Sequence, residues 1–447
     1  MTKVITYGTF DLLHYGHRNL LRRAKALGDY LIVGVTSENY DRYRGKLNVQ
    51  QTLMERIENV KALGLADEIV VEEYEGQKID DITRMGVDVF AIGSDWVGRF
   101  DYLGEYCKVV YLERTKGISS TELRDRQHPL IRLGVVGSGR IAGRFIPESK
   151  FVSGVTVEGV YNPHADSAEG FAQKHELAFS TSDYGDFLSR VNAVYIASPH
   201  ETHYGYAERA LQAGKHVLCE KPMVFSGEEA KRLFDLAREK GLILMEAIKT
   251  AYCPGFQRLV SCAKSGKIGR IVSVDAAFTK LVPPHMREMQ NNGSGGSMTE
   301  LATYPLLAIL KLLGFQYENT RFYSYYAQKD GVDLFTQIHM QYPEAIAMAR
   351  VGLGVKSEGS LVISGTRGYI YVPAPWWKTE YFELRFEDTS EVEKNFYKFS
   401  GDGLRYELTE FLTRIVERQP DESANRISME LAGIMEKYRS GDIIRLS

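Results

Sequence analysis

Two histidines near the start of the chain have the spacing and the neighbours that phosphoryl chemistry requires. His14 and His17 are three residues apart with Gly16 between them, just after a short apolar strand and a Gly-Thr turn. On the first turn of a helix, this spacing puts both imidazoles on one side, close to N–H groups and a dipole that attract anions. Imidazoles aimed at one phosphorus would stabilise the charge that grows on the α-phosphoryl oxygens during a nucleotidyl transfer. Surface histidines that match by chance are the competing interpretation, and the preceding strand and turn favour function.

A second turn, at residues 137–142, has the pattern of a dinucleotide site. The run Gly137-Ser-Gly139-Arg-Ile-Ala142 follows an expected strand at residues 131–136. Its first glycine makes the turn, its second lets a pyrophosphate approach, and the alanine packs the helix on the sheet. The next expected strand ends at Asn162, where NAD enzymes carry a ribose-binding acid and NADP enzymes a serine-arginine pair. Neither stands here, so the preference between NAD and NADP stays open.

Alternating strands and helices must position the histidine turn. Short runs rich in Val, Ile and Tyr alternate with helical stretches over residues 3–112, which predicts a parallel sheet with helices on both faces. Ligands bind at the carboxyl ends of such strands, where residues 8–17, 93–96 and 114–121 would meet. The basic segment at residues 41–46 has two interpretations: a solvated surface loop, or a mobile loop that closes on triphosphate oxygens. The second interpretation is preferred.

The rest of the chain predicts two further domains. A polar stretch that ends in Pro129 marks a boundary, and strands then alternate with helices as far as the Glu220-Lys-Pro222 sequence. Beyond that point, short strand-like runs at residues 271–386 are followed by helical stretches at 406–417 and 428–438. The expected fold class is α/β. It comprises a Rossmann-like parallel sheet (residues 1–127), a Rossmann dinucleotide-binding domain (130–250), and an α+β domain with an open, mostly antiparallel sheet (251–447) whose last helices return to the Rossmann lobe.

Composition narrows the function classes. The 55 basic and 58 acidic side chains nearly balance, which argues against a nucleic-acid partner. No apolar run approaches a membrane span and Met1 leads directly into a strand, so a cytoplasmic protein is expected. The four cysteines lack C-x-x-C spacing, and no protein-held metal is expected. Trp376 and Trp377 follow a Pro-Ala-Pro run and are expected in a rigid surface loop or a subunit contact. A homo-oligomer is expected.

Three segments give the first 124 residues a specific resemblance. They are Tyr7-Gly-Thr-Phe-Asp-Leu-Leu-His-Tyr-Gly-His17, Gly93-Ser-Asp-Trp96 and Arg114-Thr-Lys-Gly-Ile-Ser-Ser-Thr121. Together they resemble the glycerol-3-phosphate cytidylyltransferase family, with Ser120 in place of that family's usual threonine. The resemblance implies CTP as donor with Mg²⁺ on its phosphates, and a small sugar or polyol phosphate as acceptor. It implies catalytic roles for His14, His17, Lys46 and Arg114. It also implies that CTP or the acceptor is bound by Gly8, Thr9, Phe10, Arg44, Arg56, Asp95, Trp96, Thr115, Ile118, Ser119 and Thr121.

From residue 131 onward the chain resembles the glucose-fructose oxidoreductase and inositol dehydrogenase family. The Gly137–Ala142 turn and the Glu220-Lys-Pro222 signature carry this resemblance, which implies an NAD or NADP cofactor and a catalytic Lys221 beside the reacting carbonyl. The family usually has an aspartate and, four residues later, a histidine on a helix after a glycine-rich turn. This chain has Glu300 and Tyr304 there, and the dihydrodiol-dehydrogenase branch also carries the tyrosine. Further expected cofactor-site residues are Gly137, Gly139, Arg140, Ile141, Asn162, Ser198, His200, His203, Glu220 and Glu300.

The role of Tyr304 has two interpretations. A tyrosine beside a lysine cation can have its pKa lowered enough to give a proton to an alkoxide. The competing interpretation is that Tyr304 only packs, as most of the 27 tyrosines must. The acid role is preferred.

Three functional hypotheses follow. The first is a bifunctional enzyme that transfers CMP from CTP to a sugar or polyol phosphate, in particular a ketose phosphate, and reduces the carbonyl with NAD(P)H. The product would be a CDP-alditol for a capsule or wall polymer, an association drawn from domain pairing. The second is a cytidylyltransferase with a non-catalytic NAD(H)-binding regulatory domain, against which Lys221 and the intact glycine turn count. The third is AMP transfer from ATP, against which the three cytidylyltransferase segments count.

Overall fold

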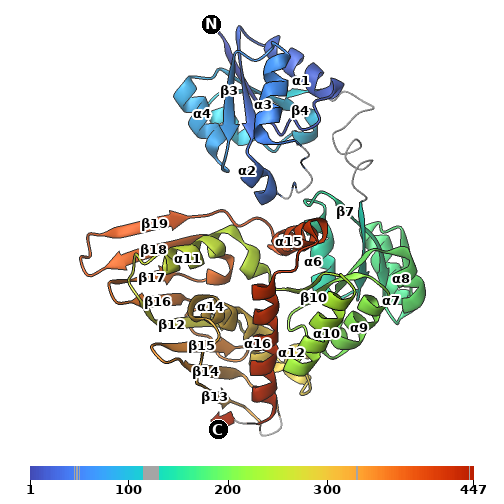
Figure 1. The fold of residues 1–447 in the computed structure, drawn as a ribbon, viewed down its shortest axis with the longest axis vertical. Coiled ribbons are helices and arrows are strands. Elements are labelled where there is room, and N and C mark those ends of the chain that lie inside the picture. Colours follow the sequence, from blue (N-terminus) through green and yellow to red (C-terminus); the bar gives the residue numbers. More distant parts are fainter. Residues whose placement is uncertain are drawn as a thin grey trace. The chain divides into compact units, whose positions relative to one another are not determined.

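The computed structural model describes residues 1–44, 46, 49, 51–113, 130–328, 331–441 and 443–446. The chain divides into two compact units, shown in Figure 1. The N-terminal unit comprises Met1–Leu130 and Phe151–Gly154, and the C-terminal unit comprises Ile131–Lys150 and Val155–Ser447. Among the helices of the described ranges, none is both long and apolar enough to cross a membrane. The α/β fold class is confirmed, with two parallel sheets and one mixed, mostly antiparallel sheet.

The N-terminal unit is a five-stranded parallel sheet in the order β3-β2-β1-β4-β5. Successive side chains of a strand point to opposite faces, so Val4 packs with Leu21 of α1 whereas Ile5 packs with Ile82 of α4. The strands are β1 (Lys3–Gly8), β2 (Tyr30–Thr36), β3 (Glu68–Glu72), β4 (Val89–Gly93) and β5 (Lys108–Leu112). The helices are α1 (Tyr15–Lys25), α2 (Glu38–Tyr43), α3 (Leu53–Ala62) and α4 (Gln77–Met85), with short 3-10 turns η1 (Ser94–Trp96) and η2 (Asp101–Glu105).

The strand order fixes where this unit can bind a ligand. The connections leave β1 in one direction toward β2 and in the other toward β4, and in sheets of this kind ligands bind at such a switch point, outside the carboxyl ends of the strands, here β1 and β4. β1 ends at Gly8, just before the histidine turn, and β4 ends at Gly93, just before η1. Two of the three segments singled out in the sequence therefore meet at one switch point. The third, residues 114–121, lies outside the described residues.

The first sheet of the C-terminal unit has six parallel strands in the order β11-β10-β9-β6-β7-β8. Its switch point lies between β6 and β9, where the glycine turn follows Val136 and Ser198 follows β9. The strands are β6 (Ile131–Val136), β7 (Val155–Tyr161), β8 (Phe179–Thr181), β9 (Ala193–Ile196), β10 (His216–Glu220) and β11 (Leu244–Ala247). The helices are α6 (Arg140–Ser149), α7 (Ala165–His175), α8 (Tyr184–Arg190), α9 (His203–Gln212) and α10 (Gly227–Glu239), with η3 (His200–Thr202) before α9.

The second sheet has nine strands in the order β19-β18-β17-β16-β12-β15-β14-β13-β20. Its pairs are antiparallel except β12 with β15 and β13 with β20. The strands are β12 (Ile271–Thr279), β13 (Asn319–Tyr325), β14 (Phe335–Gln341), β15 (Ile346–Gly352), β16 (Leu361–Gly365), β17 (Gly368–Val372), β18 (Tyr381–Phe386), β19 (Val392–Phe396) and β20 (Ile443–Leu446).

Helices cover one face of this sheet and lead back to the first one. Helices α11 (Pro254–Lys264), α14 (Thr303–Leu313) and α16 (Glu422–Arg439) share one hydrophobic core with its strands (Figure 1). The short elements η4 (Lys249–Tyr252), α12 (Arg287–Gln290) and α13 (Gly296–Leu301) precede α14. Helix α15 (Leu404–Glu417) packs against α6, and α16 packs against α10.

Two ion pairs join α6 to the first turn of α15 and to the residues just before it. Glu148 accepts from Nε and Nη2 of Arg405 at 3.0 and 2.6 Å, and both side chains are largely buried. One turn earlier, Arg144 donates through the same two atoms to Asp402 at 2.7 and 2.6 Å, in a more exposed position. These two ion pairs therefore fix the start of α15 on α6, the helix that follows the glycine turn.

The tryptophan pair departs from the expectation of a surface loop or subunit contact. Trp376, in η5 (Trp376–Lys378), is fully buried, and its indole N–H donates to the carbonyl of Ala277 on β12 at 2.8 Å. Trp377 stacks on Phe278 with ring centroids 3.6 Å apart. The pair anchors the loop after β17 on the central strand of the sheet.

Candidate active sites

The two histidines of the N-terminal unit close a capping box on helix α1. His14 is the N-cap, and its Nδ1 accepts from the backbone N–H of Gly16 at 3.1 Å. The backbone N–H of His14 donates in turn to Nδ1 of His17 at 3.5 Å. The rings are stacked, with centroids 3.9 Å apart and an interplanar angle of 18°. Because Nδ1 is an acceptor in both rings, the hydrogen bonds assign the proton of each neutral imidazole to Nε2. The helix start thus carries two Nε2–H donors side by side.

The expected binding residues Gly8 and Phe10 form the wall of this turn. Phe10 is buried with φ of 53°, and its ring meets His17 edge-on at 5.5 Å. A Cβ added at Gly8 would lie 3.0 Å from Cζ of Phe10. A side chain at position 8 would therefore crowd the phenyl ring of Phe10, which itself packs edge-on against the second histidine.

A buried carboxylate that the sequence did not single out gathers the polar groups beside the turn. Asp41, on α2, is 1% exposed. Its side chain accepts hydrogen bonds from Thr9 Oγ1 (3.0 Å), Thr36 Oγ1 (2.7 Å), Arg44 Nη2 (3.0 Å) and Arg56 Nη1 (3.3 Å). Nζ of Lys46 donates to Thr9 Oγ1 at 2.8 Å. We call this group the Asp41 cluster. It ties together β1, β2, α2 and α3.

One expectation for the basic residues needs correction. The segment at residues 41–46 is not a loop throughout, because α2 extends to Tyr43 and Ser37 caps its start. Arg56, expected to bind the acceptor or a phosphate, is fully buried and donates to the carbonyls of Thr9, Thr36 and Gln51. It supports the backbone around the site. Nη2 of Arg56 and Nε of Arg44 are buried without a hydrogen-bond partner in the described part of the chain.

Asp95 and Trp96 stand at the neighbouring strand end, as the strand order requires. Both belong to η1, where Asp95 is exposed and Trp96 packs on Phe100 with ring centroids 5.8 Å apart. Arg99 lies over the indole at 5.1 Å. The remaining residues expected here fall outside the described ranges: Arg114, Thr115, Ile118, Ser119 and Thr121.

The glycine turn of the C-terminal unit fits a dinucleotide pyrophosphate. Gly137 has φ of 100°, and an added Cβ would lie 2.8 Å from the carbonyl oxygen of Ala197 after β9. At Gly139, the N-cap of α6, an added Cβ would meet nothing within 4 Å, so the backbone there is open to a ligand. Asn162, at the end of β7, donates to Ser138 Oγ at 2.8 Å and so joins the ribose end of the site to the turn.

The first residues of α6 face the substrate-side segment. Arg140 is exposed and pairs with Glu288 of α12, whereas Ile141 is half-buried. The preceding residue of α12, Arg287, has Nη2 4.0 Å from Oε1 of Glu300. Adjacent residues of α12 thus contact the dinucleotide turn and Glu300, which is one of the expected cofactor-site residues.

Lys221, Glu300 and Tyr304 are brought together, although they lie on three different elements. Nζ of Lys221 donates to the backbone carbonyl of Glu300 at 2.9 Å and lies 4.0 Å from its carboxylate. The same ammonium is 5.7 Å from the centre of the Tyr304 ring. Glu300 is on α13 and Tyr304 on α14, and the helix is interrupted at Ala302. The pair therefore shares one side of the site across a helix junction and not within one continuous helix.

The pKa of Tyr304 moves in the opposite direction to that expected. Burial of the phenol raises its pKa above the ordinary value, and the carboxylates of Glu220 and Glu407 raise it further. Burial also raises the pKa of Glu300, which the cations Lys221 and Arg287 partly offset. The nearby ammonium does not overcome these effects, so the phenol keeps its proton.

The histidines and carboxylate expected to contact the cofactor are held by the chain itself. His203 is fully buried, with Nδ1 2.9 Å from Pro222 O and Nε2 3.0 Å from Ser198 O. His200 lies 3.3 Å from Ser294 O, and burial lowers the pKa of both histidines to about 4. Glu220 accepts from the Tyr195 hydroxyl at 2.5 Å, and burial raises its pKa. These side chains brace the loops that carry Ser198 and Lys221.

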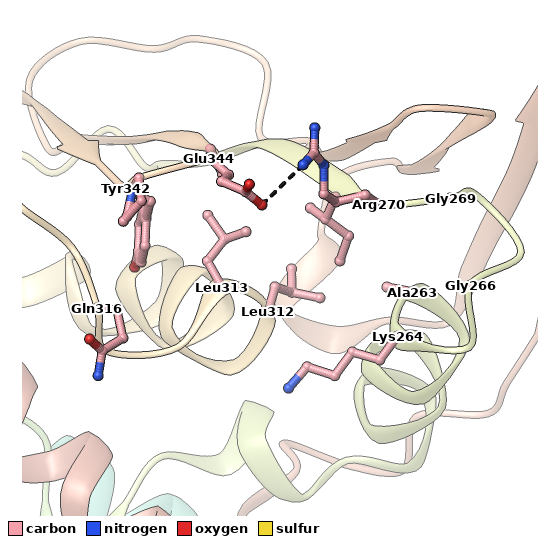
Figure 2. Close-up of a pocket in the computed structure, with 13 residues that line it drawn as sticks. Ala263, Lys264, Gly266, Gly269, Arg270, Leu312, Leu313, Gln316, Tyr342 and Glu344 are labelled. Atoms are coloured by element: carbon pink, nitrogen blue, oxygen red, sulfur yellow. Dashed lines mark hydrogen bonds and ion pairs between the residues drawn. The ribbon is translucent and has the colours of Figure 1, made fainter.

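An open hollow of about 560 Å³ lies elsewhere in the C-terminal unit (Figure 2). It is bordered by the ends of α11 and α14 and the turn between β14 and β15, and the Arg270–Glu344 pair spans its rim at 3.0 Å. None of the expected site residues lines it. In the described ranges, no three His, Cys, Asp or Glu side chains gather as a metal-ion group.

Comparison with protein families assigns each unit. Residues 5–126 match the cytidylyltransferase-like family. Residues 131–248 match the oxidoreductase family with an NAD-binding Rossmann fold, and residues 256–371 match the GFO/IDH/MocA C-terminal domain. The chain belongs to both families. The N-terminal unit is thus a cytidylyltransferase-like domain and the C-terminal unit an NAD(P)-dependent oxidoreductase of the GFO/IDH/MocA family.

The chain matches three relatives over nearly their whole lengths. The cytidylyltransferase-like domain is 48% identical over 124 residues to glycerol-3-phosphate cytidylyltransferase of Bacillus spizizenii, which covers 28% of this chain and 95% of that protein. The oxidoreductase unit is 28% identical over 322 residues to scyllo-inositol 2-dehydrogenase (NADP(+)) of Bacillus subtilis, covering 69% of this chain and 96% of that protein. The 3-ketoreductase KijD10 from Actinomadura kijaniata, solved with NADP and TDP-benzene, shares the fold with a TM-score of 0.64, 24% identity and coverage of 71% of this chain and 99% of its own.

Proposed function

We propose that the chain is a bifunctional enzyme that makes a CDP-activated polyol. The cytidylyltransferase-like domain transfers CMP from CTP to a small sugar or polyol phosphate, and the oxidoreductase unit reduces a carbonyl with NAD(P)H to give a CDP-alditol. The observation that supports this most is the presence in one chain of the capped histidine pair and the Lys221–Glu300–Tyr304 group. A CDP-alditol would serve the synthesis of a capsule or wall polymer, by association with the domain pairing.

In the first reaction, the residues would stabilise the negative charge on the phosphate oxygens. An oxygen of the acceptor phosphate attacks the α-phosphorus of CTP while the bond to the β-phosphate oxygen breaks and pyrophosphate leaves. His14 and His17 would donate from Nε2 to the non-bridging oxygens, where negative charge grows. Lys46, which donates to the hydroxyl of Thr9 just before the histidines, would neutralise the leaving pyrophosphate. Mg²⁺ carried by the CTP phosphates is the expected ion.

In the second reaction, side chains of the oxidoreductase unit would polarise and protonate the carbonyl oxygen of the substrate. Bound NAD(P)H supplies the hydride. Lys221, held by the carbonyl of Glu300, would polarise the substrate carbonyl, and the phenol of Tyr304 would give its proton to the oxygen. A raised pKa keeps that phenol protonated until the oxygen gains charge, as a proton donor requires. The relative named for scyllo-inositol acts on a polyol, which agrees in kind with a substrate of this class.

The order of the two steps is part of the proposal. CTP reacts first with a ketose phosphate, and the oxidoreductase unit then reduces the CDP-ketose. Two sites on one chain raise the local concentration of an intermediate that passes between them.

The Lys221→Ala variant tests both the function and the order. The protein is incubated with CTP, Mg²⁺, a panel of ketose and polyol phosphates, and NADH or NADPH. The variant should stall at a CTP-dependent nucleotide product that keeps its carbonyl, seen by phosphorus NMR and by a mass about two units below that of the final product, since one hydride and one proton are missing.

Each outcome bears on a different part of the proposal. Full-efficiency reduction of the free ketose phosphate without CTP would reverse the order and leave both activities standing. A Lys221→Ala variant that forms the same final product as the wild type would favour a non-catalytic NAD(H)-binding unit. Transfer of AMP from ATP in place of CMP would refute the choice of donor.

A further inference from the structure

We propose that Asp41 is a positioning residue of the cytidylyl site, which holds Arg44 and Lys46 against the histidine turn. The inference rests on the cytidylyl transfer proposed above. Asp41 lies after β2, whereas the turn follows β1, so the carboxylate joins segments that are separate in the chain. It is buried among cations and hydroxyls and would be costly to keep there unless each bond contributed.

The two carboxylate oxygens of Asp41 accept hydrogen bonds from different groups. Oδ1 accepts from Thr9 and from Arg44, both at 3.0 Å, on the side of the histidine turn. Oδ2 accepts from Thr36 at 2.7 Å and from Arg56 at 3.3 Å, both anchored in the scaffold. One oxygen therefore arranges groups that would meet the triphosphate, and the other fixes the carboxylate to β2 and α3.

The hydroxyl of Thr9 links Asp41 to Lys46 through two hydrogen bonds. A hydroxyl has one proton to donate, and here it goes to Asp41. Its lone pairs are then turned toward Nζ of Lys46, which donates to the same oxygen at 2.8 Å. Without an acceptor at position 41, the hydroxyl could rotate and would no longer fix the ammonium.

The charges explain why an acid is needed at this place. Arg44, Arg56 and Lys46 bring three cations around one carboxylate and one hydroxyl. Like charges at this distance repel, and a shared anion offsets the repulsion while directional bonds set each geometry. The cluster thus presents Arg44 and Lys46 in fixed positions before any nucleotide arrives, which is preorganisation of the kind that lowers a barrier.

Two threonines provide a matched test. Thr9 and Thr36 each give one hydroxyl to Asp41 and both are buried, but Thr9 alone also holds Lys46. Thr9→Val should lower kcat for cytidylyl transfer by ~10- to 100-fold, the worth of a bond to a charged group. The KM for CTP should change less. Thr36→Val removes a bond of the same kind, but Arg56 still holds the same oxygen of Asp41, so kcat should stay within about threefold. Thr9→Ser keeps the hydroxyl and should have a kcat close to that of the wild type.

A double-mutant cycle separates positioning from support of the fold. Asp41→Asn should lower kcat strongly in the wild-type background and by less than about threefold once Lys46→Ala and Arg44→Ala are present, because the residues it acts through are gone. Equal losses in both backgrounds, or equal effects of Thr9→Val and Thr36→Val, would overturn the positioning role. Should Asp41→Asn fail to fold, as judged by thermal unfolding, the threonine pair decides alone.

The same assay keeps the two proposals apart. If the wild-type protein releases no pyrophosphate from CTP with any acceptor of the panel, the proposed function fails and the role of Asp41 fails with it. If the wild type is active and the threonine variants behave alike, only the role of Asp41 is overturned.

Discussion

Removing Arg405 should destabilise the oxidoreductase unit far more than removing Arg144, although both arginines form two-bond ion pairs on helix α6. The pair of Arg405 with Glu148 is 18% and 8% exposed, whereas the pair of Arg144 with Asp402 is 50% and 38% exposed. Loss of Arg405 would leave a carboxylate buried without its counter-charge. Loss of Arg144 would leave Asp402 partly exposed to water and still near the cations Lys249 and Lys378.

The magnitudes follow from this difference in burial. Breaking a buried pair on one side costs about 3 kcal/mol at the low end of the observed range. An exposed pair contributes about 1 kcal/mol or less. For a unit of this size, each kcal/mol lowers the melting temperature by about 2 °C. Arg405→Met should therefore lower the melting temperature of the oxidoreductase unit by about 6 °C, and Arg144→Met by about 2 °C or less.

Scanning calorimetry measures both variants in the full chain. Methionine keeps an apolar stem at each position, so loss of charge dominates the comparison. The peak of the oxidoreductase unit is identified as the one that NADPH or NADH shifts upward. Equal shifts for the two variants, or a shift below about 2 °C for Arg405→Met, would refute the argument from burial.

Three further predictions concern cytidylyl transfer, its metal requirement and the pH dependence of stability. His17→Ala should cut pyrophosphate release from CTP by about a hundredfold or more and leave NAD(P)H binding unchanged; a wild-type rate would make the histidine structural. EDTA should stop cytidylyl transfer and spare carbonyl reduction, and loss of both activities would reveal a further metal. Because burial lowers the pKa of His200 and His203 to about 4, the unfolded state binds more protons at pH values between the ordinary and the lowered pKa. The free energy of unfolding of the oxidoreductase unit should then fall as pH drops from about 6.5 toward 4, and urea midpoints that match at pH 7.5 and 5 would contradict this.

Local signals were enough to predict the positions of the two turns. The histidine turn and the glycine turn each follow a strand and open a helix, so spacing within a dozen residues placed them at the carboxyl ends of strands. The fold class followed from the same alternation, and both family resemblances are confirmed. What the sequence could state about His14 and His17 was their shared side of a helix. The reciprocal cap that sets their tautomers needed coordinates.

The sequence could not reveal features that arise from distant segments. Asp41 lies among basic residues that suggested a loop, and its proposed role depends on hydroxyls and a guanidinium from three other segments. Trp376 follows two prolines, which suggested a surface loop, but its indole N–H donates to a carbonyl on β12 that lies 99 positions earlier in the chain. The direction of the pKa shift at Tyr304 depends in part on Glu407, which no local pattern connects to it.

The capping box of His14 and His17 also bears on how this segment can change over evolutionary time. At the N-cap position held by His14, serine, aspartate and asparagine are the side chains that would best preserve the start of α1, and none of them carries an imidazole with its Nε2–H. A substitution that keeps the helix there therefore loses the imidazole donor, and one that loses the cap also disturbs the neighbouring ring. At His14, folding and chemistry would therefore select against the same changes. Such a segment should resist drift while its surroundings diverge, which is why so short a stretch could indicate the reaction.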